Sequence, residues 1–227
     1  MKIDIGILGM GYVGLPLAIA MAEKYKVIGF DVDKNRISSL KMGIDRKKDV
    51  TSKQIKKTDL TYSNKPESLK NCNIYIVTVP TPIKNNKLPD FTFLKNASKI
   101  ISKYLKIGDI VIYESTVYPG ATEEICIPIL EISSLKINKD FYVGYSPERI
   151  NVGDQVNTFK TIPKIVSASN KYSLKKIKKL YESIIDAEVH PVSSIKIAEA
   201  AKVIENVQRD VNIAFVNELA MMFKSFE

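Results

Sequence analysis

The sequence lacks any run of 18 or more apolar residues, so it predicts no transmembrane helix. It also lacks the pattern of a signal or transit peptide, because its first apolar run, residues 3–8, leads directly into a glycine motif and reads as a strand. The 227 residues, 45% of them hydrophobic, are enough for one large or two small domains with a buried core. No membrane partner is expected.

Cysteine, histidine and arginine are scarce. The two cysteines, Cys72 and Cys126, have the spacing neither of a metal site nor of a disulfide framework, which favours a reduced, cytoplasmic setting. The single histidine, His190, precedes Pro191 at a predicted strand end and is interpreted as structural. Only four arginines occur, and scattered lysines supply most of the net charge of +9. Without a basic helix carrying aromatic residues, this charge predicts a solvated surface and no nucleic-acid groove.

A glycine motif stands between a predicted strand and a predicted helix. Residues 9–14 read GMGYVG, after the apolar run 3–8 and before a helical pattern with one apolar face. Gly9 permits the tight turn, Gly11 lets the backbone approach a pyrophosphate, and Gly14 lets the helix pack closely on the strand. The motif therefore predicts a pyrophosphate on the N–H groups at the helix N-terminus.

Asp31 follows the second predicted strand, residues 26–30, and lies 22 positions after Gly9. This spacing is expected for a carboxylate that hydrogen-bonds the adenosine ribose of a dinucleotide. No basic residue follows Asp31 directly, which favours NAD over NADP. The alternative interpretation is a structural strand–turn–helix with a surface aspartate.

Apolar strands go on alternating with helical patterns, which predicts an α/β fold with a Rossmann-like, doubly wound and mostly parallel sheet. Further strands are predicted at 60–62, 73–79, 109–113, 141–145, 165–167 and 188–191, and helices at 32–42, 91–105, 121–132 and 173–185. From 193 to 226 there is neither proline nor glycine, which predicts one long helix. We therefore divide the chain into a Rossmann-type domain, 1–192, and a long helix, 193–227, that begins a central or dimerisation region.

Two predicted strands end in loops that carry a threonine. The first loop is Pro80-Thr81-Pro82, where two prolines cannot continue the strand, and the second is Glu114-Ser115-Thr116. Ligands of doubly wound sheets bind at the carboxyl ends of the strands, so both threonines are candidate ligand contacts.

The predicted long helix is apolar almost all round, which predicts burial on several sides as a domain spine or a homodimer interface. It also carries a polar stripe of Glu199, Lys202, Asn206 and Arg209. Buried ionisable groups need a functional reason. A solvated stripe with a Glu199–Lys202 ion pair fits the same spacing, so spacing alone leaves both interpretations open.

Several stretches together resemble the UDP-glucose/GDP-mannose dehydrogenase family of nucleotide-sugar 6-dehydrogenases. They are GMGYVGLPLA (9–18), VPTP (79–82), ESTVYPGATEE (114–124), YSPERINVGD (145–154) and AEAAKVIEN (198–206). The Ser-Pro-Glu-Arg stretch resembles the branch that acts on UDP-N-acetylhexosamines, whereas the UDP-glucose branch more often has Pro-Glu-Phe-Leu-Arg-Glu there. The resemblance implies a UDP-N-acetylhexosamine 6-dehydrogenase of bacterial surface-polysaccharide biosynthesis, with a UDP-N-acetylhexosamine as substrate.

The chemistry implied by the resemblance is oxidation of the sugar C6 alcohol to a carboxylate, with NAD as the oxidant in two steps. A cysteine traps the intermediate aldehyde as a thiohemiacetal, and the resulting thioester is hydrolysed. Family members are considerably longer, and their C-terminal half holds this cysteine and a UDP-binding domain. Neither Cys72 nor Cys126 is placed to replace it. The chain is therefore expected to be the NAD-binding half, as an engineered fragment, a proteolytic product or a truncated gene, inactive alone.

The resemblance also implies which residues line the cofactor site. Besides the three glycines, these are Tyr12, Val13, Asp31, Arg36, Thr81 and Thr116. Glu148 or Thr116 is implied to hold the water that hydrolyses the thioester.

A second set of implied roles concerns the sugar. Lys202 would lie at the reacting C6 oxygen, where an ammonium stabilises an alkoxide or accepts its proton, with Asn206 beside it as an oxyanion donor. The implied substrate contacts are Arg149, Ile150 and Arg209.

Two other functions remain open at this point. A two-electron β-hydroxyacid dehydrogenase also combines a glycine loop, a long helix and a Lys-x-x-x-Asn pair, although residues 114–120 and 146–149 speak against it. The other is a dinucleotide-binding or dimerisation module without turnover. A homodimer through the long helix is expected in either case.

Overall fold

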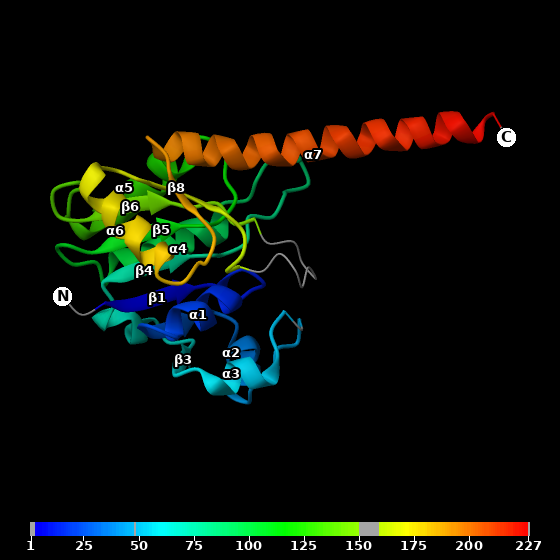
Figure 1. Cartoon of the computed structure of the whole chain (residues 1–227). Helices are drawn as coiled ribbons and strands as arrows, with labels where there is room; N and C mark the ends of the chain where they lie inside the picture. Colours follow the sequence, from blue (N-terminus) through cyan, green and yellow to red (C-terminus); the bar gives the residue numbers. More distant parts are fainter. Residues whose placement is uncertain (1–2, 48, 150–158, 227) are drawn as a thin grey trace.

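The computed structural model describes residues 3–47, 49–149 and 159–226, and these form one sheet with helices on both faces (Figure 1). The strands are β1 (Asp4–Leu8), β2 (Lys26–Phe30), β3 (Leu60–Ser63), β4 (Ile74–Val77), β5 (Ile110–Tyr113), β6 (Tyr142–Tyr145), β7 (Lys164–Ala168) and β8 (Val189–Pro191). Their order across the sheet is β3-β2-β1-β4-β5-β6-β7-β8. The pairs are parallel except β6 with β7, which is antiparallel. The predicted Rossmann-like, mostly parallel fold is confirmed.

The connecting segments are largely helical. The α-helices are α1 (Gly14–Ala22), α2 (Lys34–Lys41), α3 (Ser52–Lys57), α4 (Thr92–Ser102), α5 (Ile127–Leu130), α6 (Lys171–Glu182) and α7 (Ile195–Lys224). Two 3₁₀ turns, η1 (Pro66–Asn71) and η3 (Glu131–Ser133), and a π turn, η2 (Thr122–Cys126), complete the described elements.

The core lies in two layers, because alternate residues of the buried strands point to opposite faces of the sheet. Ile5 and Ile76 pack with α1 and α6 on one face. Tyr75 and Val77 pack with α4 and the start of α7 on the other. Strands buried on both faces are continuous apolar runs, as the fully buried β4 illustrates.

The helix predicted over residues 121–132 begins with a π turn instead of regular α-helix. The Ile127 N–H donates to the Thr122 carbonyl, five residues back. Pro128 has no N–H for the carbonyl four residues before it, and its ring crowds that carbonyl. A π turn accommodates the proline without ending the helix.

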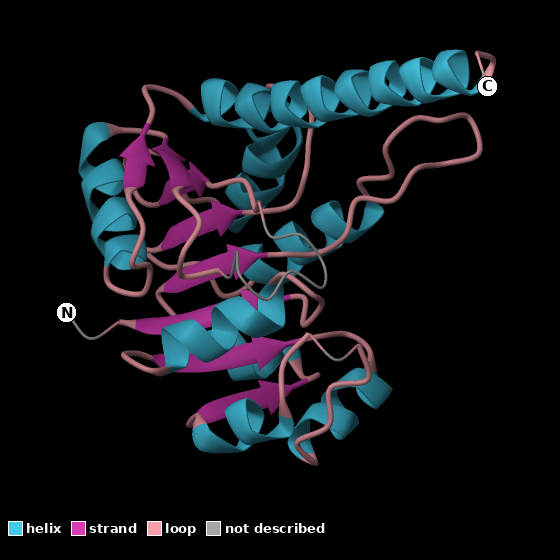
Figure 2. Cartoon of the chain, turned by 45° about the vertical axis from the view of Figure 1, so that its right-hand side comes forward, coloured by secondary structure: helices cyan, strands magenta, loops and turns pink. Residues whose placement is uncertain are grey.

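Helix α7 is long, as predicted, and only its beginning packs on the sheet. The Ser194 hydroxyl caps the helix by accepting from the Ile197 N–H at 3.3 Å. The C-terminal part projects away from the sheet in both views (Figures 1 and 2). Val211 and Phe215 are 60% and 63% exposed there, so the predicted burial on several sides is wrong for the single chain. None of the helices in the described ranges has both the length and the apolar composition that a membrane crossing requires.

Candidate functional site

The glycine loop joins β1 to α1 at the carboxyl edge of the sheet. Gly9 has φ of +101°, in the left-handed region that glycine tolerates. A Cβ on Gly14 would lie 1.9 Å from the Gly9 carbonyl oxygen and 2.4 Å from Thr78 Oγ1, whereas a Cβ on Gly11 would meet no atom within 4 Å. The fold itself therefore requires glycine at 9 and 14, while the space beside Gly11 is open.

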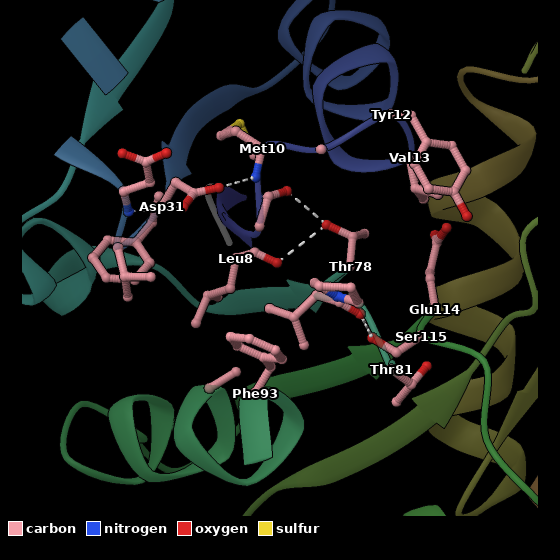
Figure 3. Close-up of a pocket in the computed structure, with 18 of the residues that line it drawn as sticks. Leu8, Met10, Tyr12, Val13, Asp31, Thr78, Thr81, Phe93, Glu114 and Ser115 are labelled. Carbon is pink, nitrogen blue, oxygen red and sulfur yellow. Dashed lines mark hydrogen bonds between the residues drawn. The ribbon is translucent and has the colours of Figure 1, made fainter. Parts of the chain in front are cut away.

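Thr78, at the end of β4, supports the loop and was not predicted as a site residue. Its Oγ1 lies 3.1 Å from the Leu8 carbonyl oxygen and 2.8 Å from that of Gly9 (Figure 3). These contacts hold the turn against the neighbouring strand. Thr78 directly follows a buried strand, and this position in the sequence is the signal that could have marked it as a site residue.

A cavity of about 890 Å³ opens beside this loop, in the size range of small-molecule and cofactor sites. Its lining includes these predicted residues: Gly9, Gly11, Tyr12, Val13, Asp31, Arg36, Thr81, Thr116, Glu148 and Lys202. Gly14 lies behind the loop and does not line the cavity. Figure 3 shows Asp31 on one side of the loop and Thr81, Glu114 and Ser115 on the other, as an elongated ligand requires.

Asp31 is tied to the loop through both carboxylate oxygens. Oδ2 accepts a hydrogen bond from the Met10 N–H at 2.8 Å, and Oδ1 accepts one from the Asp33 N–H at 2.9 Å. The carboxylate is thus fixed at the cavity, where a ribose hydroxyl can reach its remaining lone pairs.

Arg36, on α2, reaches the same end of the cavity. Its Nε donates to the Met10 carbonyl at 2.7 Å, and Nη1 donates to Asp45 Oδ1 at 2.6 Å. Burial alone would raise the pKa of Asp45. Hydrogen bonds from Arg36 and from the backbone N–H groups of Val50 and Lys47 outweigh this effect and hold the pKa below its ordinary value. Arg36 Nη2 is buried without a hydrogen-bond partner among the described residues, so this donor fits an acceptor atom of a bound dinucleotide.

The loops after β4 and β5 are hydrogen-bonded to each other. Thr81 Oγ1 donates to the Thr116 carbonyl at 2.7 Å, and Ser115 Oγ donates to the Val79 carbonyl at 2.6 Å. The Thr116 residue is exposed and lines the cavity. These bonds place both predicted threonines on one rigid wall.

Lys202, on α7, lines the cavity together with Glu148, although its side chain is only 13% exposed. Burial is the main cause that lowers the pKa of Lys202, and Arg209 and Arg149 lower it further, against the opposing effect of Glu205 and Glu148. A lysine with a lowered pKa is a better proton acceptor at neutral pH.

Arg149, Asn206 and Arg209 do not line the cavity. Arg149 Nε lies 3.3 Å from Glu205 Oε2, and Arg209 Nη2 lies 3.1 Å from Glu205 Oε1. Asn206 is exposed, one helical turn after Lys202. Ile150 lies outside the described residues. Glu205, which the sequence analysis missed, is therefore the carboxylate that the neighbouring cations share.

Glu199 does not form the ion pair with Lys202 that the spacing allowed. It is fully buried, and its carboxylate accepts from the Gly120 and Thr122 N–H groups at 2.5 and 3.0 Å. Lys202 Nζ instead lies 3.9 Å from Glu205 Oε2. Glu199 thus fixes the start of α7 to the loop that carries Thr116.

Neither cysteine lines the cavity. Cys72 and Cys126 are buried, and burial raises the pKa of each thiol to about 12. A thiol that stays protonated at neutral pH is a poor nucleophile. Within the described ranges, no three His, Cys, Asp or Glu side chains are grouped as a metal ion requires.

Comparison with known proteins agrees with this geometry. The sequence profile described as UDP-glucose/GDP-mannose dehydrogenase family, NAD binding domain, matches residues 3–185. The UDP-N-acetyl-D-glucosamine 6-dehydrogenase of Pseudomonas aeruginosa is 52% identical over 223 residues, which cover 97% of this chain and 53% of that protein. Protein CapL of Staphylococcus aureus is 51% identical over 228 residues, 100% of this chain and 54% of that protein.

Among solved structures, that of a UDP-D-ManNAc dehydrogenase from Pyrococcus horikoshii superposes with a TM-score of 0.90 at 31% identity. The superposition covers 97% of this chain and 54% of that one. The chain therefore spans about half the length of the relatives it matches.

Proposed function

Because the chain belongs to the UDP-glucose/GDP-mannose dehydrogenase family and forms its NAD-binding domain, we propose that it is the cofactor half of a nucleotide-sugar 6-dehydrogenase. The substrate we propose is a UDP-N-acetylhexosamine, as the names of the similar dehydrogenases indicate. The observation that carries this proposal is that the glycine loop, both threonine loops, Glu148 and Lys202 line one common cavity. The family match speaks against a β-hydroxyacid dehydrogenase.

In this proposal the cofactor lies along the cavity from Asp31 to Thr116. Asp31 and the buried Arg36 Nη2 bind the adenosine ribose, and the backbone at Gly11 to Val13 binds the pyrophosphate. When bound, NAD⁺ accepts a hydride from C6 of the sugar and leaves as NADH. Thr81 and Thr116 line the end at which this transfer takes place.

Lys202 and Asn206 act on the C6 oxygen. In the first oxidation the alcohol loses a hydride from C6 and a proton from oxygen, which leaves an aldehyde. Lys202 accepts that proton, as its lowered pKa favours, or stabilises the alkoxide as an ammonium, and Asn206 donates to the same oxygen. Arg149, Ile150 and Arg209 contact the substrate, and Glu148 or Thr116 holds the water for the hydrolytic step.

The second oxidation requires a thiol that adds to the aldehyde, and neither buried cysteine supplies one. In the proposal this thiol and the UDP-binding domain belong to a further part of the protein. We divide this chain into a Rossmann-type domain over residues 1–192 and the start of a central helix from 193. A cytoplasmic location and a role in polysaccharide biosynthesis are part of the same proposal.

We also propose that α7 pairs with α7 of a second copy of the chain. Val211 and Phe215 lie one turn apart and are largely exposed, and an exposed apolar helix face favours association. Light scattering should then give twice the chain mass of 25.5 kDa. The double variant Val211→Asp/Phe215→Asp should give the single mass with an unchanged circular dichroism spectrum. A monomeric parent chain would contradict the proposal.

The function is tested by reading the gene past codon 227. We expect a Gly-Gly-x-Cys segment there, and the continued protein should form NADH from a UDP-N-acetylhexosamine in preference to UDP-glucose. Lys202→Met should lower kcat by about 10²–10⁴-fold, the usual loss on removal of a general acid or base. Lys196→Met, on the same helix and 59% exposed, is the matched control. Tight NAD binding without NADH formation would support the module without turnover instead.

A further inference from the structure

A buried ion cluster lies beside the catalytic end of the cavity and includes residues with no role so far. Lys164 Nζ lies 3.1 Å from Glu114 Oε2 and 3.2 Å from Glu148 Oε2. The hydroxyl of the fully buried Tyr181 donates a short hydrogen bond to Glu114 Oε1. Both glutamates line the cavity, whereas Lys164 and Tyr181 lie behind them.

The strand direction explains how Lys164 reaches this place. Strand β7 is antiparallel to β6, so its first residue lies at the edge where the parallel strands β5 and β6 end. Glu114 directly follows β5, and Glu148 follows β6 by three residues. The reversed strand therefore brings a lysine between two carboxylates that come from the ligand edge.

The side chain of Lys164 is almost completely shielded from solvent within this cluster. Its side chain is 5% exposed, and its ammonium lies 5.4 and 5.2 Å from the ring centroids of Phe159 and Tyr181. Two carboxylates around one ammonium carry a net negative charge when all three are ionised. Burial, followed by the neighbouring Glu148, raises the pKa of Glu114 to about 7, against Lys164 and Tyr181, which oppose the rise. Glu114 therefore takes up a proton more readily than an ordinary glutamate does.

Glu148 is held at both of its oxygens. Oε1 accepts from the Arg149 N–H at 2.6 Å, and Oε2 lies beside the Lys164 ammonium. A buried ion pair seldom stabilises a fold more than apolar residues of the same size would, so stability alone does not account for the cluster. Ionisable groups of this kind gather at sites of chemistry.

We propose that Lys164 and Glu114, anchored by Tyr181, are positioning residues that keep the Glu148 carboxylate ionised and directed at the cavity. Glu148 then accepts a proton from the hydrolytic water or holds that water by hydrogen bonds. This role rests on the proposed function, in which Glu148 lies at the reacting group. Protonation of Glu114 removes the second negative charge beside Lys164. The Lys164 ammonium then stabilises the remaining carboxylate, that of Glu148.

The charge environment of Glu148 comes from several elements. The ionisable groups that interact with it are Glu114 after β5, Lys164 on β7, Tyr181 on α6 and Lys202 on α7, and Arg149 follows it in the sequence. On α7, Glu205 lies beside Arg149 and Lys202, and Arg209 lies beside Glu205. Lys164 directly contacts a Glu148 oxygen and is almost fully buried.

The test is a pH titration of the 227-residue chain labelled with ¹³C at the glutamate carboxyl carbons and followed by NMR. Glu148→Gln and Glu114→Gln assign the two signals. In Lys164→Met the titration midpoint of Glu148 should move upward by about one to three pH units, because an adjacent cation is removed. The double variant Glu114→Gln/Lys164→Met does not leave Glu114 as a buried carboxylate without its cation. Its Glu148 midpoint should lie above that of Glu114→Gln alone.

Lys160→Met is the matched control, because its ion pair with Glu23 lies on the surface and should not affect Glu148. Calorimetric NAD binding should be retained in Lys164→Met and Lys160→Met, whose side chains do not line the cavity, and this separates failure of this inference from failure of the proposed NAD site. In a protein that includes the catalytic cysteine, the acid limb of the kcat profile should move the same way in Lys164→Met, with KM for NAD unchanged. A Glu148 midpoint that stays at the parent value in both Lys164 variants would overturn the proposal.

Discussion

Gly14→Ala is expected to abolish NAD binding and to destabilise the chain by about 3 kcal/mol, at the upper end of overpacking costs. The new Cβ would lie 1.9 Å from the Gly9 carbonyl oxygen, so α1 must move away from β1 or the loop must open. Either movement removes the N–H groups of the loop from the pyrophosphate. Calorimetric titration with NAD⁺ and thermal unfolding measure the two effects.

Gly11→Ala is the matched control for this prediction. Its Cβ would meet no atom of the protein within 4 Å, so the unfolding temperature should stay at the parent value. The methyl group would occupy space next to the loop backbone, where the pyrophosphate is expected, and NAD affinity should fall by at least tenfold. If Gly14→Ala and Gly11→Ala both bind NAD with the affinity of the parent chain, the glycine loop is not part of the cofactor site.

Asp31→Ala is expected to weaken NAD binding by about 10- to 100-fold, because hydrogen bonds to a charged group contribute about 1.5–3 kcal/mol each. The change also removes the acceptor of the Met10 and Asp33 N–H groups, so a moderate loss of stability should accompany it. The fold itself should persist, since the residue is not part of the apolar core. Calorimetry measures the affinity and circular dichroism the fold.

Asp31→Asn separates the two contributions. The amide oxygen can still accept from the Met10 N–H, while the charge that favours the ribose hydroxyl is lost. We expect an affinity between those of Asp31→Ala and the parent chain. An affinity of Asp31→Ala equal to that of the parent would rule out this carboxylate as the ribose ligand.

The sequence alone was sufficient for the Rossmann-like, mostly parallel fold and for several residues that line the cavity. Strands buried on both faces are continuous apolar runs, and the glycine spacing fixes where the first helix must start. Asp31 and Thr81 follow strands, so the rule that ligands gather at the carboxyl ends of strands brings them together. The structure confirms the fold that these patterns predicted and places both residues at one cavity.

The remainder depends on contacts between distant segments, which spacing does not show. The spacing of Glu199 left a buried and a solvated stripe both open, and the structure shows that Glu199 is buried and reaches the backbone at Gly120, 79 positions away. Lys164 reaches the two cavity glutamates only because β7 runs antiparallel, and a short strand carries no signal of its direction. The apolar composition of α7 predicted burial, but composition does not show which part of a protein covers a helix. In the single chain the C-terminal part of α7 is exposed.

The most direct test of the account is a crystal structure of the 227-residue chain grown with NAD⁺ at saturating concentration. We predict the adenosine ribose at Asp31, the pyrophosphate beside Gly11 and the nicotinamide ring near Thr116 and Lys202. NAD⁺ bound outside this cavity, or a cavity without NAD⁺ under those conditions, would contradict the account.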